Sequence, residues 1–249
     1  MKRLLLSALL LVSPLAWHPA RAAEAGAAAS CAVSPELLED EPGFPNLARR
    51  LKAGQPVTIV AIGGASTAGA AAGPEAANSF PSRLEEALRK RHPNGAITVI
   101  NRGVPRQTAR EMLERFPADV LAHKPALVIW ETGTVDAVRG LDVEDFAAAL
   151  KEGIDTLHDH KIDVMLVDMQ FNPRTSSIIN FEPYLDALHR TADLEDVYLF
   201  RRYDIMRAWS DSGRFDLVGV PAGKQAALAQ EIYRCLGDAM ADAIDRPAH

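Results

Sequence analysis

Five short apolar runs, separated by segments of helical periodicity, constrain the fold of this 249-residue chain most strongly. Most of the runs consist of Val, Ile, Leu and Met, which is typical of parallel strands that helices cover on both faces. We predict the five strands at residues 57–62, 97–101, 126–131, 162–168 and 196–200. Strands that alternate with helices in this way predict one α/β domain with a doubly wound parallel sheet.

The segments between the strands carry helix signals. Thr108-x-x-Glu111 is a capping box, and it opens a helix that Pro117 interrupts or restarts. Asp142 caps the next helix, which places apolar residues on one face. Residues 80–91, 182–193 and 224–244 complete the predicted helices.

Candidate site residues follow three of the strands directly. Ligands of doubly wound sheets bind at the carboxyl ends of the strands, where Ser66, Gly103 and the segment 133–136 fall. A serine among glycines after a buried strand is held in a tight turn with its hydroxyl toward the crevice. The alternatives are a serine that only caps a turn and an ordinary glycine at the end of a strand.

Polar and cationic residues lie near the same end of the sheet. Strand four ends in a run from Asp168 to Arg174 that is either a binding surface or a network satisfied within itself. Arg106 and the pair Arg201–Arg202 would suit a ligand with negative charge, unless local acids pair with them. The predicted binding residues are Gly64, Thr67, Arg106, Thr134, Val135, Asp136, Asp168, Gln170 and Asn172.

The three strand-end blocks resemble, in order and spacing, those of the SGNH/GDSL ester hydrolases, over nearly the whole chain after residue 22. The resemblance is greatest to an exported bacterial subgroup with Asp-Met-Gln after strand four, here residues 168–170. It implies a flavodoxin-like three-layer α/β/α sandwich, no cofactor, and a small-molecule or polysaccharide ester as ligand. It also implies that Ser66 is the nucleophile and that Gly103 donates to the oxyanion.

Two blocks depart from the family pattern. Val135 stands where the family has an oxyanion-binding Asn, and Gly219 stands where a His would follow Asp216 by three residues. A second register, with Lys224 to Ala227 at the last block, has no His either. Two functions therefore remain open: an esterase with an atypical base, such as His189 or Lys224, or a non-catalytic protein that binds a carbohydrate or acyl ligand.

The beginning of the chain has the pattern of a secretory signal peptide. Lys2 and Arg3 precede an apolar stretch, and Ala20-Arg21-Ala22 is a small-x-small cleavage site. The apolar stretch is too short for a stable membrane span. We predict a signal peptide at 1–22, a leader and lead-in segment at 23–55, and one domain at 56–246, exported to the periplasm or the medium.

The net charge limits the classes of binding partner, and the two cysteines suggest a disulfide. The net charge is −6, and it becomes −9 without residues 1–22, which contain three basic residues and no acid. This argues against nucleic acid and anionic membranes as partners, and it leaves the oligomeric state undetermined. Cys31 and Cys235 form a disulfide in an exported chain, or else are two buried thiols. Without clustered histidines they do not make a metal site.

Overall fold

The computed structural model describes residues 31–38, 42–74 and 76–246, so the predicted signal peptide lies outside the described residues. Its centre is a five-stranded sheet in the order β2-β1-β3-β4-β5, with every neighbouring pair parallel. The strands are β1 (Val57–Gly63), β2 (Ile97–Gly103), β3 (Leu127–Glu131), β4 (Asp163–Val167) and β5 (Tyr198–Phe200). The predicted doubly wound parallel sheet is confirmed, and its strand order reverses between β1 and β3.

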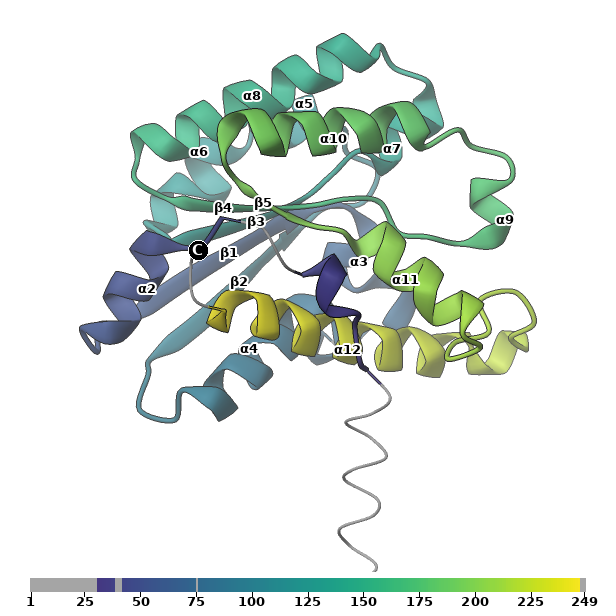
Figure 1. Ribbon diagram of the computed structural model, residues 1–249, viewed down its shortest axis with the longest axis horizontal. Coiled ribbons are helices and arrows are strands. Elements are labelled where there is room, and N and C mark those ends of the chain that lie inside the picture. Colours follow the sequence, from purple (N-terminus) through teal and green to yellow (C-terminus); the bar gives the residue numbers. More distant parts are fainter. Residues whose placement is uncertain (1–30, 39–41, 75, 247–249) are drawn as a thin grey trace, which may run out of the picture. The chain divides into compact units, whose positions relative to one another are not determined.

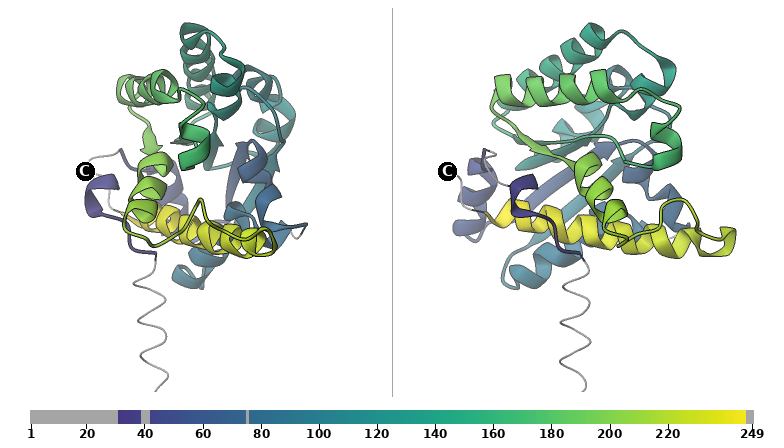
Figure 2. Two further views of the ribbon diagram at one scale, coloured as in Figure 1. Left: turned by 90° about the vertical axis from the view of Figure 1, so that its right-hand side faces the viewer. Right: turned by 45° about the vertical axis from the view of Figure 1, so that its right-hand side comes forward.

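Helices cover both faces of the sheet, which gives the expected three layers (Figures 1 and 2). One face is covered by α5 (Ala109–Leu113), α6 (Phe116–Asp119), α7 (Thr134–Arg139), α8 (Val143–Asp159) and α10 (Glu182–Glu195). The other is covered by α2 (Pro45–Lys52), α4 (Phe80–Arg91), α11 (Arg202–Asp211) and α12 (Gln225–Asp245).

Short helical turns make up the connections. Two four-residue α-helices, α3 (Ala65–Ala68) and α9 (Pro173–Ser176), follow β1 and β4 at the carboxyl end of the sheet. The 3₁₀ turns are η1 (Pro35–Leu37), η2 (Ala70–Ala72), η3 (Ala76–Asn78), η4 (Leu121–His123) and η5 (Ala222–Lys224).

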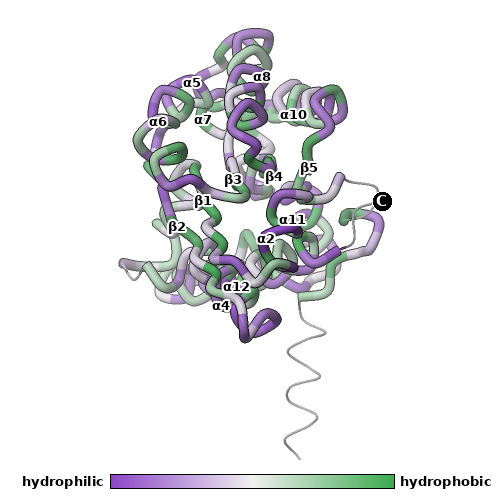
Figure 3. Tube along the Cα trace, turned by 90° about the vertical axis from the view of Figure 1, so that its left-hand side faces the viewer, coloured by the Kyte–Doolittle hydropathy of each residue, from purple (hydrophilic) through white to green (hydrophobic). Residues whose placement is uncertain are grey.

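Two apolar cores lie on the two faces of the sheet, because successive side chains of a strand point to opposite faces. In β1, Ile59 and Ala61 belong to the core beneath α4 and α12, whereas Val60 and Ile62 belong to the core beneath α5 and α8. Figure 3 shows the strands mainly in green and the helices in alternating green and purple, as expected for helices with one apolar face. The continuous apolar character of the strands therefore follows from burial on both sides.

The predicted helix starts are confirmed in detail. The Thr108 side chain accepts from the Glu111 N–H while Glu111 bonds back to the Thr108 N–H, which completes the capping box. Asp142 accepts from the N–H groups of residues 144 and 145, and Pro117 lies in the first turn of a new helix, α6. The helix α11 was not predicted from the sequence.

A disulfide joins the beginning of the described chain to the last helix. Cys31 in the lead-in segment is bonded to Cys235 in α12, as predicted, across 204 positions of sequence. Beside it the Trp209 indole donates to the Ala32 carbonyl at 3.0 Å. The segment is thus attached to the core through both α11 and α12. Within the described ranges, no helix has the length and apolar character that a membrane span needs.

Candidate active site

A cavity of about 320 Å³ opens at the carboxyl ends of β1, β3 and β4, beside the point where the strand order reverses. This is the place where ligands of doubly wound sheets bind. We call it the Ser66 cleft. It is lined by Gly64, Ala65, Ser66, Arg106, Gln107, Met112, Glu131, Thr132, Gly133, Thr134, Val135, Gln170, Asn172, Thr175 and Phe181.

The cleft contains seven of the residues that the sequence singled out: Gly64, Ser66, Arg106, Thr134, Val135, Gln170 and Asn172. Gly103, Thr67, Asp136, Asp168 and Asp216 are not among its lining residues. The side chain of Thr67 is buried and donates to Glu131 at 2.8 Å, so it supports the wall of the cleft from behind.

Two glycines permit the tight turns around the cleft. A Cβ atom at Gly103 would lie 2.2 Å from the backbone nitrogen of Ala68, so only glycine lets β2 end this close to α3. Gly133 has a φ of +90°, and a Cβ there would also lie 2.7 Å from the sulfur of Met169. These glycines fix the positions of α3 and α7 relative to the strand ends.

The nearest partner of the candidate nucleophile is an arginine. The Ser66 Oγ accepts a hydrogen bond of 2.8 Å from Nη1 of Arg202, the first residue of α11. The other terminal nitrogen of Arg202 donates to Glu131 Oε1 at 3.1 Å and to the Asp168 carbonyl at 2.6 Å. Arg202 is fully buried, so it is not one of the crevice cations expected from the sequence.

Glu131 carries the counter-charge. Its second oxygen, Oε2, accepts from the Gly64 N–H at 2.9 Å and from the Thr67 hydroxyl at 2.8 Å. Burial by itself would raise the pKa of Glu131, but the charge of Arg202 and these hydrogen bonds outweigh it, and the pKa is lowered. The pair is therefore ionised, and both carboxylate oxygens are engaged.

This arrangement limits what Ser66 can do. A guanidinium has donors and no acceptor and keeps its proton in proteins, so Arg202 cannot take a proton from the serine. Among the residues that line the cleft, none is a histidine or a lysine. The carboxylate of Glu131 already accepts hydrogen bonds from Gly64, Thr67 and Arg202. Within the described part of the chain, the Ser66 hydroxyl thus has no adjacent general base of the kind that activates a serine nucleophile.

The residues that the sequence predicted beside the oxyanion either have other contacts or carry no side-chain donor. The Gly103 N–H donates to the side chain of Asn101 at 2.9 Å, so it is engaged elsewhere in this structure. Val135 lines the cleft, and its side chain has no hydrogen-bond donor. Asp136 is buried and accepts from the Ala109 N–H at 3.2 Å, which ties α7 to α5. The oxyanion role of Gly103 remains a prediction that these contacts do not support.

The last block forms a closed turn. Asp216 accepts from the N–H groups of Val218 and Gly219 at 3.0 and 2.7 Å, and these bonds lower its pKa. The Arg174 guanidinium holds this turn by donating to the Val218 carbonyl. Asp216 is exposed, and Gly219 rather than a histidine lies three residues after it. Its catalytic role has no support in these contacts.

Neither alternative base reaches the cleft. His189 lies on α10 and lines a different cavity, where burial and then the charge of Arg201 lower its pKa. Lys224 is exposed in the turn η5 and does not line the Ser66 cleft. The structure therefore does not support a role for either residue as the base.

Asp168 is a buried carboxyl group with an incomplete set of partners. Its Oδ1 accepts from the Tyr203 N–H at 2.8 Å, and its Oδ2 has no hydrogen-bond partner among the described residues. Burial raises the pKa of Asp168 to about 7, against the opposing Tyr203 bond and the charge of Arg202. The polar end of β4 thus serves the junction between β4 and α11, and only Gln170 and Asn172 beyond it reach the cleft.

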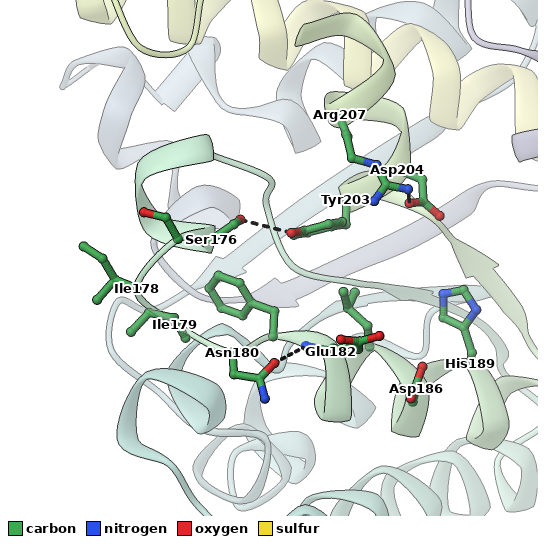
Figure 4. Close-up of a pocket in the computed structure, with 13 residues that line it drawn as sticks. Ser176, Ile178, Ile179, Asn180, Glu182, Asp186, His189, Tyr203, Asp204 and Arg207 are labelled. Carbon is green, nitrogen blue, oxygen red and sulfur yellow. Dashed lines mark hydrogen bonds and ion pairs between the residues drawn. The ribbon is translucent and has the colours of Figure 1, made fainter. Parts of the chain in front are cut away.

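A second cavity, of about 650 Å³, lies between α9, α10 and α11 (Figure 4). Figure 4 shows Glu182, Asp186 and His189 along α10, opposite Tyr203, whose hydroxyl bonds to Ser176 at 3.0 Å. Phe181 lines both this cavity and the Ser66 cleft. Within the described residues, no group of three His, Cys, Asp or Glu side chains is placed to hold a metal ion.

Lipolytic proteins and esterases of known structure share this fold. A putative lipolytic protein of the G-D-S-L family from Desulfitobacterium hafniense DCB-2 superposes with a TM-score of 0.60 and 23% identity, over 75% of this chain and 99% of that one. A two-domain esterase (CEX) active on acetylated mannans superposes with a TM-score of 0.64 and 19% identity, over 84% of this chain and 57% of that one. At these identities the likeness concerns the fold, which is that of the SGNH/GDSL hydrolases.

The family follows from the sequence comparison. Residues 30–249 match the model of the non-GDSL lipase-like family, and the chain belongs to that family. An arylesterase of Vibrio mimicus is 28% identical over 121 residues, which are 49% of this chain and 59% of the arylesterase. The match thus spans less than two thirds of that relative.

Sequence reasoning missed Glu131 and misplaced Arg202. A carboxylate at the end of an all-apolar strand was a signal, because a buried charge requires a partner. The partner could not be named, since Arg202 lies 71 positions away and belongs to a helix without a side-chain cap. Gln107 and Thr132 were also missed, and they line the cleft.

Proposed function

We propose that this protein binds a small carbohydrate or acyl ligand in the Ser66 cleft and does not hydrolyse esters there. The observation that carries the proposal is the 2.8 Å hydrogen bond from Arg202 to the Ser66 Oγ, because it pairs the serine with a group that cannot accept its proton. The family and its fold supply the cleft, and the contacts of the serine argue against turnover.

The balance of charges behind the serine supports the same conclusion. In a serine hydrolase the group beside the hydroxyl must alternate between base and acid during the reaction. Here that group is one half of an ion pair in which Arg202 and Glu131 are both at most 5% exposed. Neutralising Arg202 or Glu131 would leave the other charge buried without its partner, which costs several kcal/mol. The pair is suited to holding Ser66 in one orientation.

A slow esterase is the second candidate, and one contact favours it. A guanidinium 2.8 Å from the Ser66 Oγ would stabilise the anionic form of that oxygen. Hydroxide from the solvent would then have to remove the proton, so hydrolysis would increase with pH without reaching a plateau near neutrality. Esters of carbohydrates or lipids would be the substrates.

Labelling with a fluorophosphonate probe distinguishes the two candidates. We expect neither the wild-type protein nor Ser66→Ala to react, while an active serine hydrolase reacts under the same conditions. Circular dichroism of both samples checks that they are folded. Labelling of the wild type that is lost in Ser66→Ala would overturn the binding proposal and establish an activated serine.

We further propose that the protein is exported. The signal-like residues 1–22 and the disulfide between Cys31 and Cys235 support this, since disulfides persist in oxidising compartments. Fractionation of cells that express the full chain, with an antibody against its C-terminal region, tests it. Recovery of the whole product from the cytoplasm at full length would contradict export.

A further inference from the structure

The Ser66 cleft contains polar atoms that lack partners. Thr132 is 1% exposed, and its Oγ1 has no hydrogen-bond partner in the described part of the chain. The Oε1 of Gln107 is also buried and also lacks a partner there. Both residues line the cleft. Since most buried polar atoms in native proteins are hydrogen-bonded, these two point to a ligand with hydroxyl groups.

Ser66 adds a donor whose direction is determined by Arg202. The serine oxygen accepts from Arg202, and a hydroxyl group has one proton of its own to donate. No acceptor for this proton occurs among the described residues. Ser66 is half-buried and lines the cleft. Its hydroxyl is therefore available to donate to an oxygen atom of a bound molecule.

Arg106 gives the cleft its net charge. It lines the cleft, and no described residue accepts a hydrogen bond from its guanidinium. Its backbone has a φ of +68° and is held by a bond from Arg139 to its carbonyl oxygen at 3.0 Å. The other charge on the lining, Glu131, is neutralised by Arg202. The cleft thus carries one uncompensated positive charge in a protein whose net charge is −6.

We propose that the ligand of the Ser66 cleft is a small hydroxylated carboxylate, of the kind that a sugar acid represents. This inference rests on the binding function proposed above and names the ligand class. The carboxylate pairs with Arg106, because guanidinium and carboxylate form charge-assisted, two-point contacts. A carboxylate or hydroxyl oxygen accepts from Ser66, and the ligand hydroxyls pair with Gln107 and Thr132. A neutral ester satisfies the hydroxyl partners and leaves Arg106 without its counter-charge.

Calorimetric titration of the full folded protein with D-galacturonate, and separately with its methyl ester, tests the proposal. We expect the acid to bind and the ester to bind at least about tenfold more weakly, since hydrogen bonds to a charged group are worth roughly that much. Arg106→Met should weaken binding of the acid by about the same factor and leave binding of the ester unchanged.

A matched control variant is available. Lys124 is another exposed cation with a positive φ, +49°, and it lies in the turn before β3, away from the cleft. Lys124→Met should bind D-galacturonate like the wild type. Equal weakening in both variants would indicate a general charge effect and would overturn the role of Arg106.

The outcomes separate this inference from the function on which it rests. Equal affinity for the acid and the ester would overturn the carboxylate proposal and leave a binding protein. Release of methanol from the ester, lost in Ser66→Ala, would overturn the binding function itself. No heat with either probe, at protein concentrations that detect millimolar affinity, would overturn the hydroxylated carboxylate as the ligand.

Discussion

At the scale of single residues, Arg202 determines the character of the cleft. Its guanidinium joins Ser66, Glu131 and the carbonyl of Asp168 in one buried cluster. A buried ion pair is weak evidence for stability in itself, because desolvation offsets much of the attraction. Removing one partner is nevertheless costly, since the other charge stays buried and unpaired. Arg202 is thus a structural requirement of the cleft as well as the partner of its serine.

The first prediction concerns this residue. Arg202→Met leaves the carboxylate of Glu131 buried without its counter-charge, and we expect a loss of about 3–5 kcal/mol in the free energy of unfolding. Urea denaturation followed by circular dichroism measures it. Arg207→Met, on the exposed side of α11, should cost less than about 1 kcal/mol.

A double variant identifies the cause of that loss. Arg202→Met combined with Glu131→Gln removes both charges, and the amide oxygen can still accept from the Gly64 N–H. We expect this protein to be more stable than the single Arg202→Met variant. If the double variant were less stable, the unpaired charge would not explain the cost.

Asp168 gives a prediction about pH. Its pKa is raised from 3.8 to about 7, so the folded protein holds this proton more tightly than the unfolded chain. The stability that this provides is fully present below about pH 4 and is lost as the pH rises through about 7. Relative to Asp168→Asn, the wild type should lose about 2–3 kcal/mol between pH 5 and pH 8. The asparagine variant keeps the acceptor for the Tyr203 N–H.

Denaturant titrations at several pH values measure this difference. The informative quantity is the change with pH, because the new amide group imposes a constant cost at every pH. Asp211→Asn, at the exposed end of the same helix α11, is the control for the removal of one carboxylate from that helix. A pH-independent gap between wild type and Asp168→Asn would contradict the raised pKa.

At the scale of elements, the close contact between α4 and α12 depends on a glycine. A Cβ at Gly237 would lie 2.8 Å from backbone atoms of Arg83 and Leu84. Gly237→Ala should therefore destabilise the protein by about 1–2 kcal/mol, although alanine favours helix formation. Thermal denaturation measures it. Gly223→Ala, where a Cβ meets nothing within 4 Å, is the control and should leave the melting temperature unchanged. An unchanged melting temperature in Gly237→Ala would show that α4 and α12 can separate without cost.

The elements could be predicted wherever their signals are local. The five strands were found from apolar runs, and helix α4 was predicted with its observed bounds because its apolar residues recur at helical spacing. Helix α11 was missed because it begins at Arg202 in a run of charged residues and has no side-chain cap. Tertiary packing of Ile205, Met206 and Trp209 stabilises it, which a local pattern does not reveal.

The candidate site could be predicted in part for the same reason. Ser66, Arg106 and Val135 follow strand ends, so the topology alone brings them to one cleft. The partner of Ser66 depends on the direction of a side chain from α11, 136 positions away in sequence. No periodicity encodes such a pair. The sequence therefore located the cleft and left its chemistry open.

At the scale of the whole molecule, the disulfide is the main covalent constraint. It links Cys31 to Cys235 across 204 positions, and closing so long a loop reduces the entropy of the unfolded chain. In the chain-entropy model this contributes about 5 kcal/mol. Reduction should lower the melting temperature by about 10–20 °C, given the usual 2–4 °C per kcal/mol at this size.

Thermal denaturation with and without dithiothreitol tests this prediction. The variant with Cys31→Ser and Cys235→Ser should melt near the temperature of the reduced wild type and should not respond to the reductant. An unchanged melting temperature of the wild type after complete reduction, checked by thiol titration, would mean that the lead-in segment is held by its noncovalent contacts alone.

The span of the Arg202 cluster also has a consequence for how the chain folds. Ser66 follows β1, Glu131 ends β3 and Arg202 follows β5, and the contacts of Arg202 bridge 136 and 71 positions. Contacts of such high sequence separation form late, because the loops between them must close first. The Arg202 cluster therefore assembles only when β5 and α11 have docked. An N-terminal fragment that ended before β5 would contain every residue that lines the cleft but would lack Arg202, which orients Ser66, so the contact between Arg202 and Ser66 reports on completion of folding.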